Sequence, residues 1–217
     1  MADLVYIANA ALDRIGQSQI LSLDDPTTSA RKAKLHIGES IRQVLRGGRW
    51  KSATKQALPA QLSASPLFQW SFAYQLPDDF IRMVRVVAGT VADRVTPSPA
   101  LPVFGDAYEV PDYAIHGKNL LANDSVIQIN YVADLTFSGN DVNVTDAALT
   151  ELFILQLALA LCWPFQQSVT LRNSIMQEFQ FKFRRALATD AQDTKDPLVN
   201  RLDDSEWIRE RRFSTNA

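Results

Sequence analysis

AALTELFILQLALALCW, residues 147–163, decides the fold, because apolar side chains cover most of the circumference of the helix that it predicts. A helix of this kind is expected to be buried among other elements. Thr145 or Asp146 is expected to cap its start, and Pro164 to break it.

Three amphipathic helices are expected to surround this stretch. The first ends at Gly16, which suits a left-handed cap. The second is expected to have Pro26 in its first turn, with Asp24, Asp25, Thr27 or Thr28 as its cap, and to stop at Gly47-Gly48. The last follows Pro164 and carries one apolar stripe. The stripe consists of Leu171, Ile175, Phe179, Phe183 and Ala186.

The middle of the chain has the pattern of an antiparallel sheet. From about Trp50, short runs of aromatic and β-branched residues lie between turn signals. The clearest strand is SVIQINYV, residues 125–132, in which alternate residues share one face. A hairpin is expected at Gly117, whereas the Pro-rich segment 91–111 is expected to form a long exposed loop.

These elements predict an α+β fold. We expect a four-helix bundle formed by the N- and C-terminal helix pairs, with an inserted antiparallel β-sheet domain and an extended C-terminal arm. The expected domains are residues 1–56 and 141–190 for the helical pairs, 57–140 for the insertion and 191–217 for the arm. The arm has only scattered apolar residues, so it cannot form a core of its own.

Charge and hydropathy limit the kinds of partner that the chain is expected to bind. A net charge of -2 lacks the basic excess of a protein that grips nucleic-acid phosphates. The most apolar window, Leu149 to Leu161, contains Glu151 and Gln156 and is too short for a bilayer of about 30 Å, so we expect no membrane segment. The single cysteine, Cys162, can form no internal disulfide, which favours a cytosolic product.

No metal, cofactor or catalytic constellation is expected. His36, His116 and Cys162 lack zinc-ligand spacing, and Cys162 lies in the apolar helix, where cysteine behaves as a small hydrophobe. The segment RGGRW, residues 46–50, is too short to cradle a phosphate. We interpret it as a helix stop followed by a Trp that fills the core.

The adjacent acids Asp78 and Asp79 are the one candidate for hydrolytic or metal chemistry. Neighbouring strand residues point to opposite faces, so the two carboxylates are not expected to converge on one substrate atom. Pro77 followed by Asp is ordinary turn chemistry, because Pro fixes φ and Asp bonds neighbouring amides. A structural turn is therefore favoured over catalysis.

Several phrases together resemble one family. The first is a helix, a turn, a second helix and a Trp, carried by Asn9, Ala11, Leu12, Ile15, Gly16, Ile20, Ser22, Leu23, Asp25, Ala30, Arg31, Ala33, Trp50 and Ala53. The second is FAYQLPDDFIRMVRV, with its key residues at Tyr74, Leu76, Pro77, Asp79 and Arg82. These phrases are similar to podovirus tail tubular protein A, the head-to-tail adaptor of short-tailed phages. The resemblance covers residues 1 to about 190, and the arm matches nothing in the pattern.

The resemblance implies a bacteriophage virion protein of the tail, assembled in the host cytoplasm, with no catalytic activity. Such connectors form a homododecameric ring between the portal protein and the tail nozzle, which resembles tail tubular protein B. DNA passes through the lumen during ejection without specific binding. Asp79 matches the turn position of the family and is expected to cap or pair locally, with Arg82 as its candidate partner; Asp78 is expected to be exposed and replaceable.

Two docking segments are expected on this basis. The arm is expected to bind the portal, since a few aromatic anchors dominate many interfaces. Its contact residues are expected to be Trp207, Ile208, Arg209, Arg211, Arg212 and Phe213. The Pro-rich loop is expected to face the nozzle through Pro97, Pro99, Leu101, Pro102 and Phe104.

Two other interpretations stay open. The chain could be a non-viral helical protein-interaction module that shares the pattern, or a hydrolase that uses Asp78 or Asp79. Ring formation separates the adaptor from the module, and loss of activity in an Asp-to-Asn double variant identifies the hydrolase.

Overall fold

The chain has an α+β fold. The computed structural model describes residues 2–64, 66, 69–89, 111–136, 141–142 and 146–192. The helices are α1 (Leu4–Arg14), α2 (Thr28–Gly47), α3 (Ala147–Gln166) and α4 (Val169–Gln192), with a short 3-10 helix at Lys51–Ala53. The strands are β1 (Ala2–Asp3), β2 (Thr54–Ala57), β3 (Phe72–Gln75), β4 (Phe80–Ala88), β5 (Tyr113–His116), β6 (Asn119–Ala122), β7 (Ile127–Ala133) and β8 (Asp141–Val142).

Helix α3 lies among the other helices, as its composition predicts. It packs against α1, α2 and α4, and ten of its residues are buried. By length and composition alone α3 could also cross a membrane. Core helices have the same two properties, and the burial of α3 against three helices accounts for its apolar sequence.

The ends of α3 confirm one expectation and correct another. Asp146 caps the helix by accepting a hydrogen bond from the Ala148 amide at 2.8 Å. Pro164 was expected to break the helix, but it lies inside the last turn. The helix ends only where Gln167 adopts a left-handed conformation, with φ 49°, and the Gln167 amide donates to the Cys162 carbonyl.

The first two helices end as their sequences predict. Gly16 has φ 67°, and the amide of Gln17 bonds the carbonyl of Leu12, as in a Schellman-type cap. Thr27, one of the expected capping residues, caps the start of α2 by accepting a hydrogen bond from the Ala30 amide, so Pro26 precedes the helix and does not lie in its first turn. The interpretation of RGGRW is confirmed: Trp50 is fully buried, and its indole N–H donates to the Val44 carbonyl at 2.9 Å.

The glycine pair at the end of α2 makes room for two aromatic rings. A Cβ on Gly48 would lie 2.6 Å from the Trp50 ring, and a Cβ on Gly47 would lie 3.1 Å from the Phe183 ring. Trp50 and Phe183 themselves meet edge to face at 5.6 Å between ring centroids. A side chain at position 48 would therefore force the Trp50 ring to move, and a side chain at position 47 would contact the Phe183 ring tightly.

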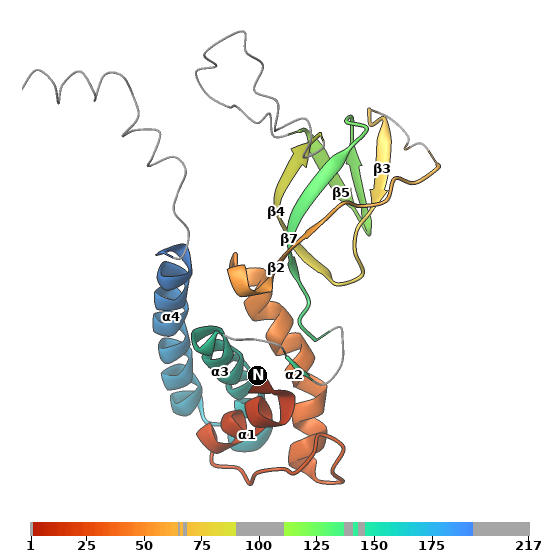
Figure 1. Cartoon of the computed structure of the whole chain (residues 1–217). Helices are drawn as coiled ribbons and strands as arrows, with labels where there is room; N and C mark the ends of the chain where they lie inside the picture. Colours follow the sequence, from red (N-terminus) through yellow and green to blue (C-terminus); the bar gives the residue numbers. More distant parts are fainter. Residues whose placement is uncertain are drawn as a thin grey trace, which may run out of the picture.

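The middle of the chain forms two small antiparallel sheets, with strand orders β2-β7-β4 and β3-β6-β5. The short strands β1 and β8 pair separately. The predicted hairpin joins β5 to β6 at Gly117, which has φ 62°. The two sheets share a core that includes Tyr74, Leu120 and Ile129. Figure 1 shows the sheets projecting beyond the C-terminal end of α2.

Strand β4 is irregular in a way that connects the sheets to the helices. Its register against β7 shifts between Phe80 and Arg82 and again between Met83 and Arg85. The extra residues, Ile81 and Val84, pack against the helical core, whereas Phe80 and Met83 pack into the core between the sheets. The two bulges let one strand contribute to both cores.

The boundaries drawn from the sequence between the domains stay predictions. In the structure β2 begins at Thr54, before the expected start of the insertion, and α4 continues to Gln192. Residues 193–217 lie outside the described part of the chain.

Candidate functional site

The two adjacent acids lie in the turn between β3 and β4, which belong to different sheets. Asp79 is 13% exposed; its carboxylate binds the Lys55 ammonium at 2.7 Å and accepts a hydrogen bond from the Tyr131 hydroxyl at 2.8 Å. Asp78 is 61% exposed and lies 3.3 Å from the ammonium of Lys118. The two carboxylates therefore bind different lysines on different elements, as structural residues do.

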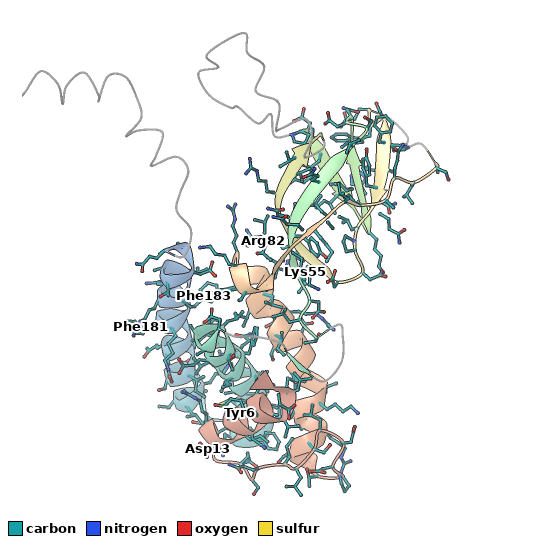
Figure 2. All side chains as sticks on the ribbon, in the orientation of Figure 1. Tyr6, Asp13, Lys55, Arg82, Phe181 and Phe183 are labelled. Carbon is teal, nitrogen blue, oxygen red and sulfur yellow. The ribbon has the colours of Figure 1, made fainter. Side chains whose placement is uncertain are left out.

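Arg82 does not pair with Asp79, so that expectation is wrong. Its guanidinium donates to the backbone carbonyl of Arg46 at 3.2 Å, in the last turn of α2. Carbonyls at a helix C-terminus lack partners within the helix, and a cation there also interacts favourably with the helix dipole. Figure 2 shows Arg82 and Lys55 near the end of α2, where the sheets meet the helices.

Asp134 adds a second polar link at this joint. Its carboxylate accepts a hydrogen bond from the Arg42 guanidinium of α2 at 2.8 Å, and its amide donates to the Asp79 carbonyl at 2.7 Å. Burial would raise the pKa of Asp134, but the hydrogen bonds from Thr136 and Arg42 outweigh burial and lower it. The joint between sheets and helices is thus held by both apolar packing and charge.

The Tyr131 hydroxyl makes the joint sensitive to alkaline pH. Burial, followed by the hydrogen bond to Asp79, raises the pKa of Tyr131 from 10.0 to about 12. A phenol whose pKa is higher in the folded chain stabilises the fold below the unfolded value, and the contribution is lost as pH rises from about 10 to about 12.

We therefore expect the free energy of unfolding to fall by about 2 kcal/mol more in the wild type than in Tyr131→Phe over this pH range. Urea unfolding of both proteins at a series of pH values measures the difference, with their difference at neutral pH as the baseline. Parallel pH profiles would contradict the assignment.

A second polar cluster joins three helices. The Arg14 guanidinium of α1 binds Glu178 of α4 at 2.7 Å, and Lys182 of α4 binds both Glu178 and Glu151 of α3. The hydrogen bond from Lys182 is the largest cause that lowers the pKa of Glu178. Burial would lower the pKa of Lys182, but its bonds to Glu151 and Glu178 outweigh burial and raise it. These charges satisfy one another, so the cluster is structural.

Two exposed helix faces carry charges that have no ion-pair partner among the described residues. On α4, Phe181 is 67% exposed, and it lines a shallow hollow with Gln177, Gln180, Arg184 and Arg185. We call Gln177, Phe181, Arg184 and Arg185 the α4 face. Within the described part of the chain, neither guanidinium of this face has an ion-pair partner.

The other exposed face lies on α1. Tyr6 is 60% exposed, and Asp3 and Asp13 are exposed as well. The spacing of Tyr6, Ala10 and Asp13 places these three residues on one side of the helix, and together with the capping residue Asp3 we call them the α1 face. Among the described residues Asp13 has no ion-pair partner, and the Asp3 carboxylate accepts only the Val5 amide that it caps.

The expected docking segments lie outside the described residues. This applies to the arm residues Trp207, Ile208, Arg209, Arg211, Arg212 and Phe213. It also applies to the loop residues Pro97, Pro99, Leu101, Pro102 and Phe104. Their roles stay predictions.

The α1 and α4 faces were not expected from the sequence. One signal for the α4 face was available: Phe181 lies off the apolar stripe of Phe179 and Phe183, two residues from each, and two arginines follow it. An aromatic residue on the polar side of a helix, beside two arginines, matches the enrichment of aromatic residues and arginine in protein interfaces.

No protein-family model matches the chain, and no curated protein matches it. The fold and the contacts described above therefore carry the functional argument, together with the sequence motifs.

Proposed function

We propose that this protein is a head-to-tail adaptor of a short-tailed phage, a structural virion protein that forms a ring between the portal and the tail nozzle. In this proposal the four helices act as one bundle that builds the ring. The sheets and the Pro-rich loop face the nozzle, the arm docks on the portal, and DNA passes through the lumen without specific binding.

The observation that carries the proposal is the arrangement of the two parts of the chain. The sheets project from the end of α2 and are attached through Arg82, Asp134 and the bulged strand β4 (Figure 1). A protein that joins two different assemblies must present separate surfaces in a defined relative orientation. A joint made of packed and hydrogen-bonded side chains suits that task.

The residues that carry the family resemblance support the proposal in a second way, because many of them build the fold. The Asn9 side chain exchanges two hydrogen bonds with the backbone of Ile20, at 2.9 and 2.8 Å. Ala30, Ala33 and Trp50 are completely buried. A pattern maintained by packing is what a structural protein requires.

The hydrolase interpretation has less support. Lys55 and Tyr131 already bind both carboxylate oxygens of Asp79, and Asp78 binds a lysine elsewhere. A non-viral interaction module has the same fold requirements as the adaptor, so only assembly separates these two functions. Particle averages of the purified chain with its portal protein test the proposal through their rotational symmetry.

Removing the arm tests how the ring attaches. Truncation after Ala191 is expected to abolish binding to the portal protein encoded in the same genome and to leave the unfolding temperature nearly unchanged. The core supports the second expectation, since Ala186 is the last buried residue in the described part of the chain. Co-sedimentation with the portal measures binding, and calorimetry measures stability.

Point variants in the full-length chain refine this test. Trp207→Ala and Phe213→Ala are each expected to weaken portal binding at least about tenfold, as aromatic hot spots do. Ser205→Ala is the matched control in the same segment and is expected to bind normally. Unchanged binding by the truncated chain would overturn the assignment of the arm.

A further inference from the structure

The two exposed helix faces are complementary in charge and alike in their apolar content. The α4 face carries two arginines beside Phe181, and the α1 face carries two aspartates beside Tyr6. We infer that the α4 face of one copy binds the α1 face of the next copy. The inference deepens the proposed function. The contact between copies does not depend on that function, but its closure into a ring does.

The geometry within one copy keeps the two faces apart. Helices α1 and α4 each pack on α3, and the ion pair between Arg14 and Glu178 links them beside the two faces, since Arg14 follows Ala10 by four residues and Glu178 precedes Phe181 by three. Phe183 points toward the other helices, whereas Phe181 lies on the outer side of α4, and Tyr6 and Asp13 mark the face on α1 (Figure 2). The faces are exposed together in one chain, so they can meet only between copies.

Two different patches that bind each other produce a head-to-tail contact. Such a contact repeats from copy to copy and gives a closed ring, or an open filament when the rotation does not close. A contact between identical patches would instead place the arginines of two α4 faces together, which costs free energy through like-charge repulsion. Charge complementarity therefore favours a second copy in a head-to-tail arrangement.

Single charge reversals in the full-length chain test the inference. Asp13→Arg changes the α1 face, and Arg184→Glu changes the α4 face. Each variant alone is expected to self-associate at least about tenfold more weakly than the wild type, because like charges then face each other. Sedimentation velocity over a wide range of concentrations measures the association, which is expected to weaken with added salt.

Mixing the two variants is the decisive experiment. In an alternating assembly, the arginine introduced on α1 meets the glutamate introduced on α4, and every other contact joins two wild-type faces. The equimolar mixture is therefore expected to regain association close to that of the wild type. A mixture that associates no better than its components overturns the inference, as does a wild-type chain that stays monomeric at all concentrations.

A matched control lies on the same helix. Arg172 is exposed and precedes Phe181 by nine residues, two and a half helical turns, so it lies on the opposite side of α4. Arg172→Glu makes the same charge change and is expected to leave association unchanged. An equal loss of association in this control would mean that net charge, rather than the α4 face, governs assembly, and would overturn the inference.

Disulfide cross-linking tests independently whether the two faces of different copies lie close together. Cys162 is completely buried, so cysteines introduced at Tyr6 and at Phe181 in separate chains would be the reactive thiols. A head-to-tail contact predicts cross-linked heterodimers when Tyr6→Cys and Phe181→Cys chains are mixed under oxidising conditions. Cross-linking only within each pure variant would overturn it.

The outcomes separate this inference from the proposed function. Rings that form on the portal and ignore both charge reversals would retain the adaptor and refute the interface. If the mixed variants regain association but form open filaments and no rings, the interface stands and the adaptor function is refuted. Reversals that weaken portal binding but not self-association would assign the α4 face to the portal and overturn the inference.

Discussion

Trp50→Ala is expected to lower the free energy of unfolding by about 4 kcal/mol, the largest effect of any single change proposed for this chain. Trp50 is fully buried, contacts Phe183 of α4, and donates its indole N–H to the end of α2. Its loss leaves a cavity between α2 and α4. Gly48 would lose the Trp50 ring that packs against it, and Phe183 would lose its edge-to-face contact.

Trp163→Ala is the matched control, because Trp163 is 59% exposed near the end of α3. We expect a change within about 0.5 kcal/mol, as for other surface substitutions. Urea unfolding followed by circular dichroism measures both variants. Equal losses of stability in the two proteins would contradict the role assigned to Trp50.

Asp79→Ala is expected to cost about 2 kcal/mol, the second largest effect on stability. The substitution removes the ion pair with Lys55 and leaves the buried Tyr131 hydroxyl without its acceptor. Lys55 can regain water, since its side chain is 53% exposed, so most of the loss comes from Tyr131. Asp79→Asn keeps an acceptor oxygen and is expected to cost about half as much.

Asp78→Ala is the control from the adjacent position. Asp78 and Lys118 are 61% and 79% exposed, and pairs of this kind contribute little, so we expect a change within about 0.5 kcal/mol. A double-mutant cycle between Asp79→Ala and Tyr131→Phe is expected to show a coupling of about 1 kcal/mol. Equal effects of the two single aspartate variants would refute the distinction between them.

The contacts of the turn were less predictable than the turn itself. Proline followed by two acids indicates a turn, which is a local conformation that can be predicted from neighbouring residues alone. The partners of Asp79 lie 24 and 52 residues away along the chain, on β2 and β7. Arg82, only three residues away, is turned toward α2 because bulges interrupt the alternation of β4. Local spacing therefore suggested the wrong partner.

The apolar stripes and caps of the helices, the alternation in β7 and the glycine of the hairpin are local properties, so the sequence by itself determined the four helices, the clearest strand and the order of the elements. The division of the strands into two sheets and the double contact of β4 depend on pairing between distant segments. The same holds for the two exposed helix faces: helical periodicity shows which residues share a side, but only packing around α3 decides which side remains uncovered. Phe181 is one of several phenylalanines in α4, and only its exposure in the tertiary structure identifies it as a candidate contact residue.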